Sequence, residues 1–116
     1  MIKILLPVFN ITTGWYFGDV EVYKKVCAKR EDNDGIYKSN IDQCSGFCSG
    51  SIAWVEDYTE VGAILHELTH MVHHILEAVG VDDEETRAYC TGYLGERLFK
   101  AMDKKFGGEN NGTSKD

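Results

Sequence analysis

The sequence predicts an α+β protein with a small antiparallel or mixed sheet that packs on one long helix and on a second, C-terminal helix. The first half holds short apolar and β-branched runs separated by turn residues, whereas the second half repeats its apolar residues with a helical period. A length of 116 residues suits one domain. We expect that domain over residues 1–104 and a disordered tail over 105–116, which has almost nothing to bury.

Charge and hydropathy narrow the classes of partner. The net charge is -7 and the basic residues are scattered, which disfavours a nucleic-acid partner. The opening MIKILLPVFNITTG is too short and too weakly basic for a signal peptide, and no segment approaches the roughly 18 apolar residues of a membrane span. We therefore expect a cytoplasmic protein without a membrane partner. The sequence does not indicate its oligomeric state.

The four cysteines are irregularly spaced and include no C-x-x-C pair. Together with the missing export signal, this favours reduced thiols over two disulfides or an all-thiolate zinc site. A pair or a metal site formed by Cys44 and Cys48 alone is the alternative; the other two cysteines are Cys27 and Cys90.

Residues 2–9 predict a first strand, in which Pro7 indicates an edge position or an early end. Thr12, Thr13 and Gly14 are then expected to interrupt it. Gly18 and Asp19 can cap a helix over residues 20–30 that packs on the sheet. Residues 31–43 read as a loop, with a possible short strand near residue 36.

Two short apolar runs, 46–48 and 51–55, predict a hairpin. Its second strand stands just before the long helix and is either an ordinary strand or an exposed edge to which an extended peptide substrate can add. Asp57 or Thr59 would cap the helix that follows.

That helix covers residues 63–79, and Gly80 ends it. One side carries an apolar stripe that requires a core: Ile64, Leu68, Met71, Ile75 and Val79. The second helix is expected over residues 83–104, where Ala88, Gly92, Gly95 and Phe99 form a stripe of little bulk. Each glycine inside a helix costs about 1 kcal/mol relative to Ala, which indicates close approach of another helix, and the first long helix is the expected partner.

The long helix also contains all four histidines and the motif H-E-x-x-H at residues 66–70. On a helix, His66 and His70 lie about 40° apart and one turn from each other, so both imidazoles can reach one metal ion. Glu67 points about 100° away from His66, where it can act on a water bound to that metal. The alternative is an amphipathic helix whose exposed side happens to carry histidines.

A catalytic zinc usually has three protein ligands and one open position, so a third ligand is required. The nearby candidates are Asp83, Glu84, Glu85, His73 and His74. Position on the second helix favours Glu85 over Glu84. The competing interpretation of Glu85 is a capping box in which Asp82 is the N-cap. His73 and His74 lie too far along the helix to share an ion with both ligands, and are exposed or secondary donors.

The combination of His66-Glu67-x-x-His70 with a glutamate on the following helix resembles the gluzincin branch of the zincin metallopeptidases. It is similar to small phage-encoded metallopeptidases and to the ImmA/IrrE-type peptidase domain over about residues 52–99. The resemblance implies a minimal zincin-like fold, zinc bound by His66, His70 and Glu85, and Glu67 as the catalytic base. Tyr89 stands where the thermolysin-like branch has an aspartate.

The chemistry implied is hydrolysis of a peptide bond by a metal-activated water, with Glu67 as general base. Tyr89 is a candidate donor to the oxyanion because it lies about 40° from Glu85 on its helix, and Tyr93 is the next candidate. Both can equally serve packing alone. Carboxylates available to orient the imidazoles are Asp57, Glu77 and Glu96.

The main hypothesis is therefore a zinc metallopeptidase that acts on a peptide or protein in the cytoplasm, which is the host cytoplasm if the protein is phage-encoded. The alternative is a catalytically silent, zincin-fold binding or regulatory protein that docks a peptide or a host protein. A purely structural zinc site has no use for a base and normally closes its fourth position, so the motif favours the enzyme.

Overall fold

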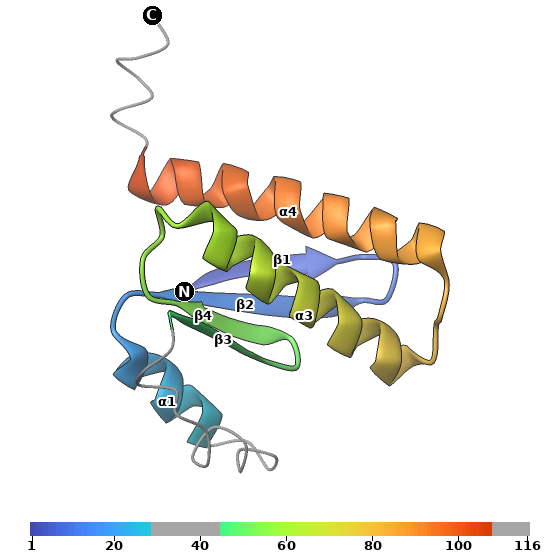
Figure 1. The fold of residues 1–116 in the computed structure, drawn as a ribbon, viewed down its shortest axis with the longest axis horizontal. Coiled ribbons are helices and arrows are strands. Elements are labelled where there is room, and N and C mark those ends of the chain that lie inside the picture. The colour runs from blue at the N-terminus through green and yellow to red at the C-terminus, as the bar shows by residue number, and fades with distance from the viewer. Residues whose placement is uncertain (29–44, 108–116) are drawn as a thin grey trace, which may run out of the picture.

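The structure, a computed structural model, describes residues 1–28 and 45–107. It confirms the α+β prediction: a mixed four-stranded sheet lies between two long helices on one face and a short helix on the other (Figure 1). The elements in chain order are β1 (Ile2–Leu6), β2 (Ile11–Phe17), α1 (Val20–Ala28), β3 (Gly46–Ser49), β4 (Ile52–Val55), α3 (Val61–Val79) and α4 (Glu84–Phe106).

The strand order in the sheet is β1-β2-β4-β3. The β1–β2 and β3–β4 pairs are antiparallel hairpins, and β2 joins them by running parallel to β4. Helix α3 lies over β3 and β4, and α4 lies over β1, so the two long helices sit side by side on one face (Figure 1).

The first hairpin departs from the sequence prediction at its second strand. β1 lies at the edge and ends at Leu6, before Pro7, as predicted. The predicted break at residues 12–14 is wrong, because these residues lie inside β2, where Thr13 Oγ1 donates a hydrogen bond of 2.9 Å to the carbonyl of Ile4. The β-branched and aromatic residues around Gly14 favour a strand strongly enough to include one glycine.

The second hairpin forms as predicted, and Gly50 occupies its turn with a φ of 63°. The alternative in which residues 51–55 form an exposed edge strand is wrong. β4 is paired on both sides, with β2 and with β3, so β3 is the outer strand of the sheet at this end. β2 and β4 pair in parallel, with Trp15 opposite Ala53, and local sequence patterns do not predict this register.

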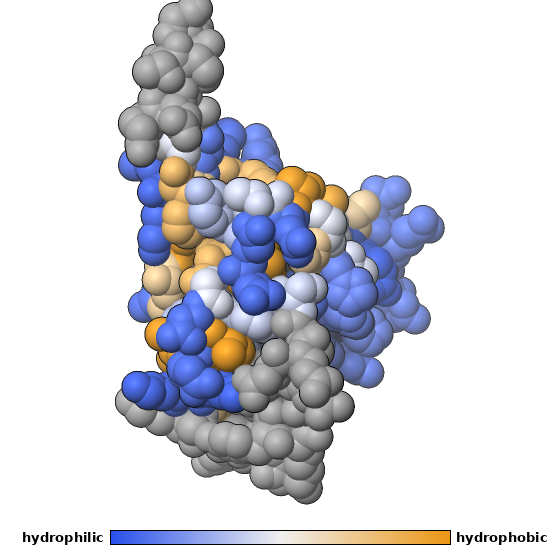
Figure 2. Space-filling model, turned by 60° about the vertical axis from the view of Figure 1, so that its left-hand side comes forward, coloured by the Kyte–Doolittle hydropathy of each residue, from blue (hydrophilic) through white to orange (hydrophobic). Residues whose placement is uncertain are grey.

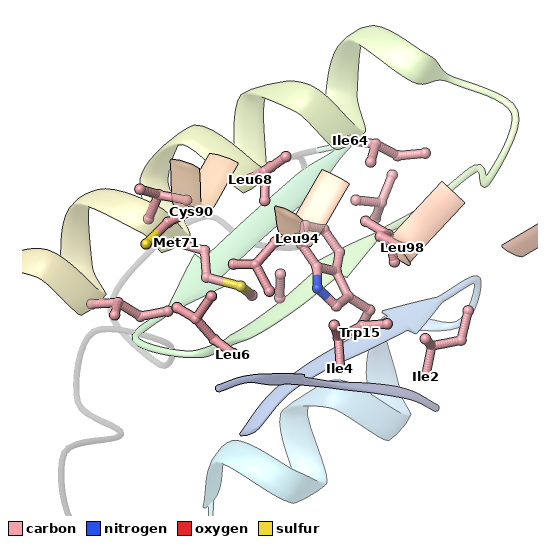
Figure 3. Close-up of a cluster of buried hydrophobic side chains, with 14 of the residues drawn as sticks. Ile2, Ile4, Leu6, Trp15, Ile64, Leu68, Met71, Cys90, Leu94 and Leu98 are labelled. Atoms are coloured by element: carbon pink, nitrogen blue, oxygen red, sulfur yellow. The ribbon is translucent and has the colours of Figure 1, made fainter. Parts of the chain in front are cut away.

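The main core lies between the sheet and the two long helices (Figure 3). Four residues of the predicted α3 stripe are buried: Ile64, Leu68, Met71 and Ile75. The fifth, Val79, is 39 % exposed, which corrects the prediction, because it occupies the last position of α3. The core is completed by residues of the sheet and α4, including Ile2, Ile4, Leu6, Trp15, Leu94 and Leu98.

Helix α1 covers the opposite face of the sheet, as the sequence predicted. Tyr23 and Cys27 are buried against Trp54, and the Tyr23 hydroxyl donates to the carbonyl of Ile52 at 3.0 Å. Asp19 Oδ1 accepts a hydrogen bond from the amide of Glu21 in the first turn, in agreement with the predicted start of the helix. Residues 29 and 30 of the predicted helix, and the predicted loop over 31–43, lie outside the described residues.

The start of α3 differs from the prediction, whereas its end agrees. Neither Asp57 nor Thr59 caps the helix: Asp57 Oδ1 accepts from the Thr59 amide at 2.9 Å and thereby closes the preceding turn. At the other end Gly80 adopts a φ of 76°, which suits glycine. Its amide and that of Val81 donate to carbonyls of the last turn, forming a Schellman ending.

Helix α4 begins with Asp83 as its N-cap, whose Oδ2 accepts from the Thr86 amide at 2.8 Å. The alternative interpretation, a capping box of Asp82 and Glu85, is therefore wrong, because the N-cap is Asp83 and its partner is Thr86. The helix continues to Phe106, two residues beyond its predicted end at residue 104. The Phe106 ring stacks on Tyr58 with centroids 4.3 Å apart, and this contact explains the two extra helical residues. Residues 108–116 lie outside the described part of the chain.

The predicted close approach of the two long helices holds for one of the two glycines. A Cβ placed on Gly95 would lie 3.3 Å from Leu68 Cδ2, whereas a Cβ on Gly92 would meet nothing within 4 Å. Gly92 is exposed. The two long helices therefore approach closely at Gly95, whereas Gly92 faces solvent.

Apolar residues reach the surface in several places between hydrophilic ones (Figure 2). Val22, Val61 and Leu65 are each about half exposed. None of the described helices is long and apolar enough to cross a membrane. Cys90 is buried in the core as a free thiol, and Cys44, which belongs to the alternative cysteine pair, lies outside the described residues.

Candidate metal centre

The two histidines of the motif meet on the exposed side of α3. His66 Nε2 lies 3.2 Å from His70 Nε2, and the ring centroids are 4.7 Å apart with an angle of 74° between the ring planes. One helical turn separates the residues, so the backbone of α3 alone brings the two nitrogens together. Both side chains are exposed.

This separation fits a shared metal ion. Zinc–nitrogen bonds of about 2.0–2.1 Å in tetrahedral geometry place two ligating nitrogens about 3.3–3.4 Å apart. The observed 3.2 Å is within a few tenths of an ångström of that distance. The two imidazoles thus fit zinc as a pair of ligands, and their exposure leaves room for water or substrate.

Glu67 lies beside this pair in a different environment. It is 5 % exposed, and within the described chain it forms no hydrogen bond or ion pair. Burial raises the pKa of the Glu67 carboxyl, and the nearby His66 and His70 lower that pKa by a smaller amount. A carboxyl in such a setting holds a proton more readily than an exposed one, which suits a general base that must later release it as an acid.

Two surface hollows meet at Glu67, on the side of α3 that faces β3. Gly46, His66 and Glu67 line both of them. The first hollow is completed by Phe47, Cys48, His70 and His74, and the second by Ser45, Glu60, Gly62 and Ala63. The buried carboxylate is therefore reachable from either side along the helix.

The other two histidines flank the pair and do not converge with it. The ring of His74 stacks against that of His70 with centroids 6.4 Å apart, and burial together with the charges of His73 and His70 lowers its pKa. His73 Nε2 lies 3.7 Å from Glu77 Oε1 on the exposed surface. Glu77, a predicted orienting carboxylate, thus faces His73 instead of His66 and His70.

The structure does not bring Glu85 to the two histidines. Glu85 is exposed in the first turn of α4. A short connection, residues 80–83, joins the start of α4 to the C-terminal end of α3 (Figure 1). Helix α3 continues for nine residues beyond His70, which is about 13 Å. Within residues 1–28 and 45–107, no three His, Cys, Asp or Glu side chains are grouped so that they could hold a metal ion. Glu84, the second candidate, occupies the same exposed turn.

The angular positions of His66 and His70 around α3 also place them away from α4. Leu68 contacts α4 at Gly95. His66 and His70 each lie two residues from Leu68, about 160° away around the helix. Both histidines therefore face away from α4 and toward the β3 side.

The tyrosines proposed for the oxyanion lie elsewhere. Tyr89 is 51 % exposed and stacks on Tyr93, and the Arg97 guanidinium lies 4.5 Å from the centre of the Tyr93 ring. Tyr93 is two residues from Gly95, about 200° around α4, so it points away from α3. Neither tyrosine is brought to the histidines.

Two further predicted partners of the imidazoles are engaged elsewhere. Glu96 Oε2 lies 3.3 Å from Lys100 Nζ on the exposed surface of α4. Asp57 bonds to Thr59 in the turn before α3, and these hydrogen bonds lower the pKa of the Asp57 carboxyl. Both were predicted because a carboxylate can orient an imidazole, but the sequence does not indicate the direction in which a side chain points.

Sequence reasoning missed Gly46 and Cys48 as residues of the site. The predicted hairpin contained both, and their spacing of two places them on one face of a strand. Only the tertiary packing shows that this face meets α3. A lone glycine inside a predicted strand was the available signal, since such a glycine often marks close approach of another group.

Comparison of the chain with protein-family models, with curated proteins and with solved structures gave no match.

Proposed function

We propose that this protein is a zinc-dependent peptidase in which His66 and His70 bind the metal and Glu67 is the general base. The observation that carries the proposal is the 3.2 Å separation of the two Nε2 atoms, at which the two imidazoles can share either a hydrogen bond or a zinc ion. It matches the geometry of two zinc ligands, and a buried carboxylate adjoins the pair in the same hollow. A helix that merely exposed histidines would not require a buried glutamate between them.

Bound zinc supplies a Lewis acid that polarises a carbonyl and acidifies water. Glu67 takes a proton from the attacking water on one carboxylate oxygen and returns it to the leaving amine. The hollows on either side of Glu67 give the substrate chain room to pass in both directions.

Glu85 is not part of this proposal, because it lies at the far end of α3. Cys48 lines the same hollow as the two histidines, on the strand that they face. A third zinc ligand can therefore be sought by comparing zinc binding in Cys48→Ser with zinc binding in Glu85→Gln. Glu84→Gln is the matched control, because it removes a charge from the same exposed turn as Glu85→Gln.

The test measures zinc binding and hydrolysis separately. Equilibrium dialysis should give about one zinc per chain in the wild type and in Glu67→Gln, and a loss of binding in His66→Ala and in His70→Ala. Hydrolysis of quenched fluorescein-labelled casein should fall at least a hundredfold in Glu67→Gln, in line with the effect of removing a general base. Zinc binding that survived both histidine changes would refute the metal site, and undiminished hydrolysis in Glu67→Gln would refute the mechanism.

The second candidate function is a zincin-fold binding or regulatory protein without catalysis. It is favoured by one observation: the described residues bring together only two of the three usual protein ligands. The two candidates differ in the dialysis result. A wild-type chain that binds no zinc, and whose folding is unaffected by His66→Ala, would support the binding protein.

A further inference from the structure

We infer that Gly46 is a positioning residue whose missing side chain makes the space that holds the Glu67 carboxylate against β3. This inference deepens the proposed function and rests on it for the role of Glu67. The steric part of it, however, can be tested on the zinc-free protein.

The contact between the two residues is close. A Cβ on Gly46 would lie 2.9 Å from Glu67 Oε2, 3.1 Å from Cγ and 3.3 Å from Cδ. Three atoms of one side chain therefore occupy the volume that any other residue would need. The corresponding nearest distances are 3.1 Å at Gly14 and 3.3 Å at Gly95, where the neighbours are a methionine sulfur and a leucine methyl.

Backbone conformation does not explain this glycine. The described glycines with positive φ are Gly18, Gly50 and Gly80, and Gly46 is not among them. Gly46 pairs with Val55 in an ordinary antiparallel register, in which a residue with a side chain would stabilise the strand better. Space for Glu67 is the remaining physical reason for a glycine at this position.

Packing is also what fixes the carboxylate. Glu67 is nearly buried and forms no hydrogen bond or ion pair within the described residues, so no polar contact with those residues orients it. The wall on the β3 side is the backbone of Gly46. A methyl group there would push the carboxylate away from the strand and toward the hollows that contain the histidines.

The steric test is a set of double-mutant cycles by thermal unfolding without zinc. Gly46→Ala should lower the melting temperature in the wild-type background and by the same amount in Glu67→Gln, which keeps the shape of the side chain. In Glu67→Ala the loss should largely disappear, because the clashing atoms are gone. Equal losses in all three backgrounds would overturn the inference, whether or not the protein is an enzyme.

The functional test uses zinc and labelled casein. Gly46→Ala should bind as much zinc as the wild type, since the histidines are untouched, while kcat falls about tenfold to a hundredfold with little change in KM, as expected for a base displaced by about 1 Å. Gly92→Ala is the control, because a Cβ there meets open space. A wild-type kcat in Gly46→Ala would overturn the positioning role. A wild type that neither binds zinc nor cleaves casein would refute the proposed function, and the unfolding cycles would still decide whether Gly46 positions Glu67.

Discussion

The packing of α3 on α4 can be tested with two glycines of the same helix. Gly92 and Gly95 both lie inside α4, and replacing an exposed helical glycine by alanine stabilises a protein by about 1 kcal/mol. At Gly92 the new methyl group meets nothing within 4 Å. Gly92→Ala should therefore raise the free energy of unfolding by about 1 kcal/mol, which is about 4 °C in melting temperature for a chain of this size.

At Gly95 the same change meets Leu68 Cδ2 at 3.3 Å. Leu68 is 1 % exposed and cannot move freely, so overpacking of about 1–3 kcal/mol opposes the gain in helix propensity. Gly95→Ala should be neutral or destabilising by up to about 2 kcal/mol. Urea unfolding of both variants measures the difference, and the loss at Gly95 should shrink in a Leu68→Ala background. Equal stabilisation at both glycines would refute the close approach of the helices that orients the histidine motif.

Three other predictions concern the metal, the C-terminal end of α4 and the core thiol. Zinc at a hundredfold excess over its Kd should raise the free energy of unfolding by about 2.7 kcal/mol in the wild type and not in His66→Ala, as measured by urea unfolding with and without EDTA. Phe106→Ala should cost about 2 kcal/mol, because the half-buried ring loses its stack on Tyr58, and Lys104→Ala, a change of an exposed residue in the same turn, is the control in the same melting assay. Burial raises the pKa of the Cys90 thiol above 9.0, so the unfolded chain ionises first and stability should fall as pH rises above 9. Cys90→Ala should remove that slope, and an unchanged slope would contradict this cause.

The sequence predicted the elements whose signals are local. The period of α3, the stop at Gly80, the edge position of β1 and the second hairpin can each be read from a few adjacent residues. The strand β2 was missed because Thr12, Thr13 and Gly14 resemble a turn until their neighbours are known. In the fold, Thr13 bonds to β1 and Trp15 fills the core, so tertiary contacts decide the state of this segment.

In the candidate site, too, the sequence predicts the residues related by local geometry and not those that depend on tertiary packing. His66, Glu67 and His70 are related by helix geometry alone, and the structure brings the two imidazoles together as the motif requires. Glu85, by contrast, depends on how long α3 is and on which side of α3 faces α4. A short motif encodes neither the length of α3 nor the side that faces α4. The same spacing of 15 residues between His70 and Glu85 therefore allows a shared metal ion in some arrangements of two helices and not in others.

Burial of the α3 stripe determines from which side the proposed metal site can be completed. Leu68 faces α4, and the histidines lie about 160° away around the helix. Turning them toward α4 would expose Ile64, Leu68 and Met71, each worth about 1.5–3 kcal/mol when buried, and would place two imidazoles in the core. Burial of this stripe therefore stabilises the orientation with the histidines on the β3 side by more than one additional metal ligand on α4 could offset. For this reason the residues that position the proposed base, Glu67, should be sought on β3, beginning with Gly46, rather than on α4.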